Sequence, residues 1–196
     1  MTPLKIALSP YRRHMSDWGS CTKCPLHEGR SMVVLAKGQL PCDLLFVGEA
    51  PGKSDDILGK PFMGPAGKLL DEIIATALSG LFPYRIAFTN IIACIPLEDG
   101  EKTSEPNPSD IKSCRPRLLE MIRIAKPSLI ILVGKLAKKY TPSQSEIRPT
   151  RTRLIRYVEI DHPAYLLRLK HAQQGLAIRR AEVRIRCGVQ EEFGNA

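Results

Sequence analysis

Two cysteines that stand three positions apart give the strongest chemical signal in the sequence. Cys21 and Cys24 form a C-x2-C pair, a spacing that lets two thiolates reach one metal centre. Cys94 and Cys114 fall on expected loops later in the chain and could complete a set of four ligands. Thiolate ligands suit either zinc or an iron–sulfur cluster, and the spacing alone does not distinguish the two.

A second group of residues could act on a sugar and a base. Glu49 and Asp55 could orient water or stabilise positive charge on a sugar, although Asp55 could equally cap a helix. Phe62 could stack on a base or pack in the core. Asn90 could read a base edge with its amide or serve as a turn residue. His162 could donate to a substrate oxygen that gains charge, or be structural.

The remaining two cysteines predict no chemistry. Cys42 and Cys187 each lie alone in an apolar or helical stretch, which is typical of a small buried residue. The N-terminus has no extended apolar stretch before a cleavage site, so we expect a cytoplasmic, intracellular protein without a disulfide framework. No apolar run is longer than the five residues of 129–133, which is far too short to cross a membrane.

Alternating strands and helices are expected to position these residues. Strands are expected over 43–48, 85–90, 128–133 and 154–160, and the first and third of these hold apolar runs. Apolar residues at helical spacing predict a helix over 69–78, and further helices are expected over 109–124, 135–140 and 176–193, with a surface loop over 97–108. The pattern predicts an α/β fold, a three-layer α/β/α sandwich with a central, mainly parallel four-stranded sheet. In such sheets the site lies beyond the carboxyl ends of the strands.

The whole chain, residues 1–196, is interpreted as one domain. Residues 16–29 are expected to form an irregular, metal-binding lead-in, and residues 174–196 a basic C-terminal helix. The 43% hydrophobic content of the 196 residues excludes a disordered chain.

The charge of the chain indicates a polyanionic partner. Its 29 Lys and Arg residues exceed its 20 Asp and Glu residues, for a net charge of +9. From Arg148 to the end, ten Lys and Arg stand against five Asp and Glu, so this last quarter carries a net +5. Such a positive field favours nucleic acid as the partner.

Five sequence blocks, taken in order, resemble one family. They are Gly48-Glu49-Ala50-Pro51-Gly52; the segment 59–70, GKPFMGPAGKLL; Thr89-Asn90, four residues before Cys94; Cys114-Arg115-Pro116; and the segment 162–168, HPAYLLR. Together they are similar to the family 4, iron–sulfur type of the uracil-DNA glycosylase superfamily. The blocks with the C-x2-C pair extend over residues 21–168, most of the chain.

The resemblance implies a cofactor and a reaction. A [4Fe–4S] cluster would be held by the four cysteines at positions 21, 24, 94 and 114. The activity implied is DNA repair, in which the N-glycosidic bond of uracil is hydrolysed to leave an abasic site. Glu49, Asp55 and His162 match catalytic positions of the family. Ala50, Phe62 and Asn90 match positions that bind the flipped uracil.

The resemblance also implies how DNA is held. The segment 162–168 would enter the duplex, with Leu166 or Leu167 as the wedge and Arg168 on phosphate. Arg151 and Arg153 lie where a common Arg-Gly element of the family is missing, and we expect them to replace its phosphate contacts. The expected partner is single- or double-stranded DNA that contains uracil, bound by a monomer without a membrane partner. Two alternatives remain open, namely a DNA-binding family member with little or no activity and a zinc protein that binds nucleic acid.

Overall fold

The central sheet is built from five strands. A computed structural model describes residues 9–98, 102–147 and 154–194. The strands are β1 (Lys37–Gly38), β2 (Leu44–Gly48), β3 (Ile86–Asn90), β6 (Leu129–Val133) and β7 (Arg156–Ile160), in the spatial order β1-β3-β2-β6-β7. The four predicted strands are confirmed and are mutually parallel. The fifth, β1, is a two-residue antiparallel edge strand, too short to leave a periodic signal in the sequence.

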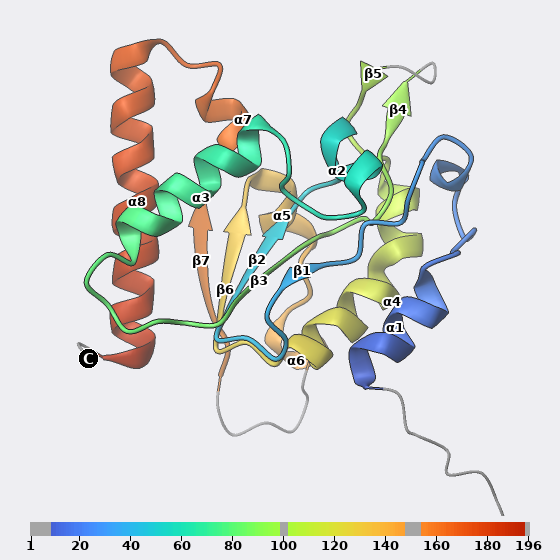
Figure 1. The fold of residues 1–196 in the computed structure, drawn as a ribbon, viewed down its shortest axis with the longest axis horizontal. Helices are drawn as coiled ribbons and strands as arrows, with labels where there is room; N and C mark the ends of the chain where they lie inside the picture. Colours follow the sequence, from blue (N-terminus) through green and yellow to red (C-terminus); the bar gives the residue numbers. More distant parts are fainter. Residues whose placement is uncertain (1–8, 99–101, 148–153, 195–196) are drawn as a thin grey trace, which may run out of the picture.

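Helices cover both faces of this sheet (Figure 1). The helices are α1 (Pro10–Trp18), α2 (Lys53–Leu58), α3 (Pro65–Ala77), α4 (Pro108–Ala125), α5 (Lys135–Tyr140), α6 (Gln144–Ile147), α7 (Pro163–Leu166) and α8 (His171–Phe193). Helices α3 and α8 pack on one face, and α4 and α5 pack on the other. The three-layer α/β architecture predicted from the sequence is therefore confirmed.

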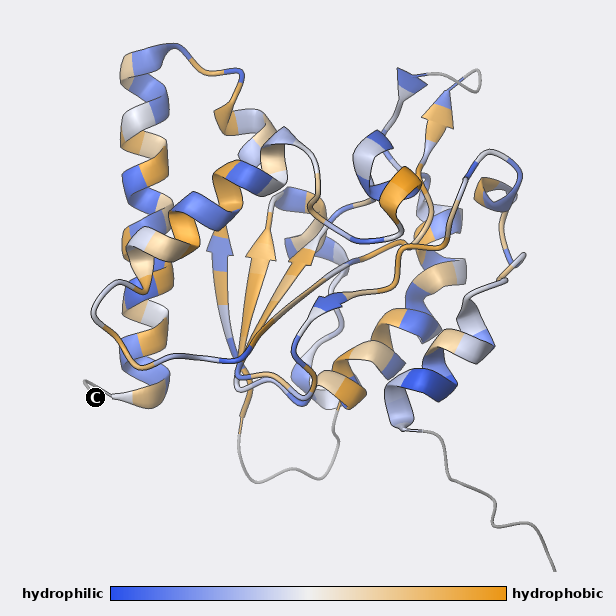
Figure 2. Ribbon diagram, viewed as in Figure 1, coloured by the Kyte–Doolittle hydropathy of each residue, from blue (hydrophilic) through white to orange (hydrophobic). Residues whose placement is uncertain are grey.

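Side-chain alternation along the strands divides the core in two. In β2, Leu44 and Phe46 face the α3–α8 layer, whereas Leu45 and Val47 face the α4–α5 layer. Strands β2 and β6 are buried throughout, as expected for parallel strands covered on both sides. Figure 2 shows the hydrophobic residues concentrated on these central strands.

Several predicted boundaries differ from those of the structure. The lead-in was expected to be irregular from Ser16, but α1 continues to Trp18, because the Trp18 indole donates to Glu120 at 2.8 Å and so holds the helix against α4. The C-terminal helix begins at His171, earlier than expected. Within the expected loop 97–108, β4 (Leu97–Glu98) and β5 (Lys102–Thr103) pair as an antiparallel hairpin.

The order of the strands positions the site. The chain passes from β2 to β3 on one side and then returns to place β6 on the other side of β2. Ligands of open α/β sheets bind at such a switch point, outside the carboxyl ends of the strands. None of the described helices is long and apolar enough to span a membrane.

Candidate active site

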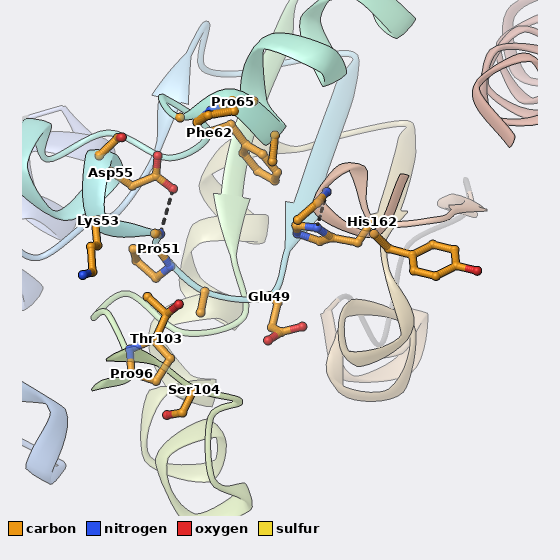
Figure 3. Close-up of a pocket in the computed structure, with 18 of the residues that line it drawn as sticks. Glu49, Pro51, Lys53, Asp55, Phe62, Pro65, Pro96, Thr103, Ser104 and His162 are labelled. Atoms are coloured by element: carbon orange, nitrogen blue, oxygen red, sulfur yellow. Dashed lines mark hydrogen bonds between the residues drawn. The ribbon is translucent and has the colours of Figure 1, made fainter. Parts of the chain in front are cut away.

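A cavity of about 510 Å³ opens beyond the carboxyl ends of β2 and β7. This volume lies within the range that encloses small-molecule ligands. Its wall includes the predicted residues Glu49, Ala50, Asp55, Phe62, His162 and Arg168. Figure 3 shows Glu49, Phe62 and His162 around one space, with Thr103 and Ser104 on another wall. The fold thus brings most of the predicted site together.

Glu49 follows β2 directly and is half-buried in this wall. Burial raises the pKa of its carboxyl, and the negative charge of Glu105 raises it further. Within the described part of the chain, no hydrogen bond to this carboxylate is found. Glu49 is therefore the carboxylate of the site whose oxygens stay available to a ligand or a water molecule.

Asp55 lies in the same wall, but both oxygens of its carboxylate already accept hydrogen bonds. It is 7% exposed; one carboxylate oxygen accepts from the Gly52 N–H at 3.1 Å, and the other accepts from the Met63 N–H at 2.6 Å. The contact with Gly52 caps the N-terminus of α2, so the helix-cap interpretation of Asp55 is confirmed. Asp55 joins the two ends of the loop that carries Phe62.

Phe62 is held in an unusual backbone conformation. Its φ is +57°, in the left-handed region that few non-glycine residues adopt. Gly67 makes this possible, because a Cβ there would lie 2.0 Å from the Phe62 carbonyl oxygen. The Lys37 ammonium donates to that same carbonyl at 3.1 Å. The Phe62 ring is 7% exposed and packs on Phe88, yet it lines the cavity, so it belongs to both the core and the site.

Asn90 stands at the end of β3, in register with Gly48 on β2. A Cβ added to Gly48 would lie 2.4 Å from Asn90 Oδ1 and 2.5 Å from Phe62 Cζ, so the amide and the ring meet over this glycine. The Asn90 side chain is 2% exposed, and its Nδ2 has no hydrogen-bond partner. A buried donor of this kind costs about 1–3 kcal/mol unless it is satisfied. Asn90 is therefore the last residue of a paired strand and not a turn residue, with a buried donor that no described residue satisfies.

His162 caps the N-terminus of α7 and also lines the cavity. Its Nδ1 accepts from the Ala164 N–H at 3.2 Å, which places the proton of the neutral ring on Nε2. Burial lowers the pKa of His162, and the positive charge of Arg168 lowers it further. The neutral ring with a free Nε2–H can donate to a ligand oxygen.

The segment after His162 requires one correction. Leu166 was expected as a possible wedge, but it is 0% exposed because it packs in the core between the sheet, α3 and α8. Leu167 is 45% exposed and Tyr165 is 48% exposed, and Arg168 is exposed at the cavity wall. The predicted contacts of Arg151 and Arg153 lie outside the described residues.

The β4–β5 hairpin supplies wall residues that the sequence did not indicate. Pro96, Thr103 and Ser104 line the cavity opposite the loop after β2. Each strand of the hairpin has two residues, which is too short for an alternating pattern to be recognised. No other feature of the sequence could have identified these residues as part of the site.

The four predicted cysteine ligands line a second, smaller cavity. The four cysteines share its wall with apolar Trp18, Val33 and Ala93 and with three basic residues, Lys23, Arg30 and Arg117. Burial raises the pKa of both Cys24 and Cys94. At Cys94 the Arg30 guanidinium, which donates to Cys94 Sγ at 3.2 Å, opposes the rise. Among the described residues, no three His, Cys, Asp or Glu side chains form a group placed to hold one metal ion.

The other two cysteines differ from each other. Cys42 is 2% exposed, as predicted for a small core residue, and burial raises its pKa to about 12. Cys187 was expected to be buried but is exposed, because it lies on the outer side of α8, where Gly188 rather than Cys187 contacts the sheet. All six cysteines are free.

Comparison with known proteins identifies the family. The model of the family described as "Uracil DNA glycosylase superfamily" matches residues 36–183. This chain belongs to the uracil-DNA glycosylase superfamily. The match includes the loops of the cavity and two of the four cysteines at the second cavity.

Individual members of the superfamily are similar over much of the chain. The type-4 uracil-DNA glycosylase of Archaeoglobus fulgidus is 34% identical over 121 residues, which cover 62% of this chain and 58% of that protein. The type-4 uracil-DNA glycosylase of Pyrobaculum aerophilum is 39% identical over 61% of this chain and 58% of its own length. That of Thermotoga maritima is 36% identical, over 61% of this chain and 59% of its own length. The chain thus matches less than two thirds of each of these relatives.

Proposed function

We propose that this superfamily member is a monofunctional uracil-DNA glycosylase. The observation that carries the proposal is the buried Asn90 Nδ2, which has no partner among the described residues and whose amide lies beside the Phe62 ring. Phe62 in turn lines the cavity together with Glu49 and His162. This combination offers a stacking surface, a polar edge reader, a carboxylate and a neutral histidine to one small planar ligand.

Asn90 accounts for the choice of base. Its Nδ2 would donate to uracil O4, and its Oδ1 would accept from uracil N3–H. Cytosine presents the reverse polarity on this edge, with an acceptor at N3 and a donor at the 4-position. Bound cytosine would therefore leave buried groups of Asn90 unpaired, which gives strong discrimination. The base reaches the cavity by flipping out of the duplex, which costs a few kcal/mol and least at weak pairs.

Glu49 and His162 account for the hydrolysis. The bond between sugar C1′ and uracil N1 breaks with both electrons leaving on uracil, so the sugar becomes positively charged and the base negatively charged. The Glu49 carboxylate stabilises the sugar cation or orients the water whose oxygen bonds to C1′. His162 Nε2–H, together with the backbone around Ala50, stabilises the charge on uracil O2. The proton lost by the water is finally carried by the released base, which leaves as neutral uracil beside an abasic site.

Asp55 has a positioning role in this proposal. Because both of its oxygens accept backbone N–H groups, it holds the loop that carries Phe62 instead of contacting the sugar. Leu167, and not Leu166, is the residue available to fill the gap left by the flipped base, with Arg168 next to it for a phosphate. The proposed enzyme acts as a monomer inside the cell.

The four cysteines fit a [4Fe–4S] cluster. All four line one cavity, and an arginine donates to one sulfur, which favours the thiolate form that a cluster requires. A cluster separates its thiolates by iron and sulfide, so the four thiols need not converge on a single ion. When bound, the cluster supplies structural cross-links between the lead-in, the loop after β3 and helix α4.

Release of uracil tests the proposed function. Oligonucleotides with uracil opposite guanine, opposite adenine and in a single strand should yield free uracil and an abasic site that breaks only with alkali. The Asn90→Ala variant should release uracil at least about 100-fold more slowly, because a transition-state hydrogen bond is lost. Gln144→Ala is the matched control, since it removes another amide with an unpartnered Nε2 at the opposite end of the sheet (Figure 1). No uracil release from the wild-type protein would favour the DNA-binding alternative.

A further inference from the structure

The largest fully buried side chain in the described part of the protein is an arginine. Arg117 on α4 is 0% exposed. Its guanidinium donates to Thr89 Oγ1 at 3.0 Å, to the Asn90 carbonyl at 2.5 Å and to the Ile91 carbonyl at 3.0 Å. All of these acceptors are electrically neutral, and Arg117 Nε has no partner.

Among the described residues, this buried cation has no anion paired with it. Removal of an arginine from water without a counter-charge is strongly unfavourable. Arg117 also lines the cavity that holds the four cysteines. The thiolate ligands of a cluster would bring negative charge to that cavity, next to the unpaired guanidinium.

The other side of the same guanidinium reaches the uracil site. The carbonyl that it binds at 2.5 Å belongs to Asn90, whose side chain reads the base in the proposed function. It also binds Thr89, whose hydroxyl donates in turn to the Leu35 carbonyl. Arg117 therefore holds the backbone at the end of β3, and this backbone sets the direction of the Asn90 amide.

We propose that Arg117 is a positioning residue that couples the four-cysteine site to base recognition by Asn90. The inference rests on the proposed function and on the cluster in that cavity. Negative charge at the cysteines stabilises the guanidinium in its buried position, and the guanidinium orders the Asn90 backbone. Coupling between two sites is reciprocal, so uracil bound at Asn90 also strengthens retention of the cluster.

Two substitutions of Arg117 separate its charge from its hydrogen bonds. Arg117→Lys keeps the positive charge but loses the forked contact with two carbonyls. Arg117→Gln loses the charge as well. Arg115→Gln is the matched control, because Arg115 lies on the same helix beside Cys114 but is ion-paired with Glu146 and partly exposed. Each full-length protein is prepared with its cluster and compared with the wild type.

Three measurements test the coupling. Both Arg117 variants should lower kcat/KM for uracil DNA about 10- to 100-fold, the loss of one charge-assisted hydrogen bond. Only Arg117→Gln should shift the reduction potential of the cluster to a more negative value, since a nearby positive charge favours the added electron. Saturating free uracil should slow the chelator-induced loss of cluster absorbance at least about twofold in the wild-type protein.

Each measurement can overturn the inference. A reduction potential of Arg117→Gln equal to that of Arg115→Gln would remove the charge coupling. An unchanged kcat/KM in both Arg117 variants would remove the link to Asn90. If the Arg117 variants do not fold, the uracil effect on the wild-type cluster still decides, and its absence contradicts the coupling. A wild-type protein that keeps the cluster but releases no uracil would refute the proposed function. The difference in reduction potential between Arg117→Gln and Arg115→Gln would still test the charge coupling.

Discussion

Gly48 provides the sharpest test of how the base site is packed. In Gly48→Ala the new Cβ would lie 2.4 Å from Asn90 Oδ1 and 2.5 Å from Phe62 Cζ. Ordinary contacts begin near 3.4 Å, so each neighbour overlaps the new methyl group by about 1 Å. The alanine itself is not strained, because the φ of Gly48 lies outside the left-handed region.

Neither neighbour of Gly48 can move freely. The Asn90 backbone is held in the parallel ladder with β2 and by Arg117, and the Phe62 backbone is held by Lys37 and by close contact with Gly67. Overpacking of this kind costs about 1–3 kcal/mol of unfolding free energy. For a chain of this size the melting temperature should fall by roughly 2–10 °C. A displacement of about 1 Å at the reacting base should slow uracil release about 100-fold.

The assay compares Gly48→Ala with Gly175→Ala. Gly175 lies within α8, where an added Cβ would meet nothing within 4 Å. That control should gain about 0.5–1 kcal/mol and release uracil at the wild-type rate. Wild-type melting and uracil release in Gly48→Ala would refute the packing itself. A lower melting temperature with unchanged uracil release would confirm the packing but refute the placement of the base over Asn90 and Phe62.

Four further predictions concern the wedge, the pH dependence, the cysteines and the lysine behind Phe62. Leu166→Ala should cost about 2–5 kcal/mol of unfolding free energy, measured by denaturant titration, whereas Leu167→Ala should change it by no more than about 0.5 kcal/mol. Leu167→Ala should slow uracil release from duplex DNA but not from single-stranded DNA. Equal stability losses in the two variants would contradict the burial of Leu166. If ionised Glu49 is required, activity is full above the pKa of its carboxyl in the folded protein and falls as the pH drops through that value. Because burial raises this pKa, the acidic fall of kcat/KM should occur at a higher pH than for an ordinary carboxyl. Glu49→Gln should lower kcat and abolish this acidic fall. Cys24→Ser should lose the cluster absorbance and lower the melting temperature, while exposed Cys187→Ser should change neither, and a cluster retained in Cys24→Ser would refute its ligand role. Lys37→Met should lower kcat/KM about tenfold, because it removes the hydrogen bond to the Phe62 carbonyl; tenfold is the lower end expected for one charge-assisted hydrogen bond. Lys68→Met, at an exposed lysine, is the control. Equal kinetics of the two variants would show that the Lys37 hydrogen bond does not position Phe62.

Local patterns were sufficient to predict the layers of the fold and the loops of the site. Continuous apolar runs identified β2 and β6, because strands buried on both faces contain few polar residues. The rule that sites lie beyond the carboxyl ends of such strands then placed Glu49 and His162 at one cavity, as observed. The short strands β1, β4 and β5 left no detectable signal, since two residues cannot display an alternating pattern.

The sequence alone determined which residue types were available for the chemistry, and tertiary contacts decided which of them remain free to perform it. Asp55 and Glu49 were equal candidates by sequence, but only the folded loop shows that backbone N–H groups occupy both oxygens of Asp55. Adjacent Leu166 and Leu167 likewise separated into a core residue and an exposed one, because a helical turn directs neighbouring side chains to different faces. Arg117 was detectable only as a charged residue on the apolar stripe of α4, four positions before buried Met121. Its contacts with β3 depend on segments far apart in the chain, and no local pattern encodes such contacts.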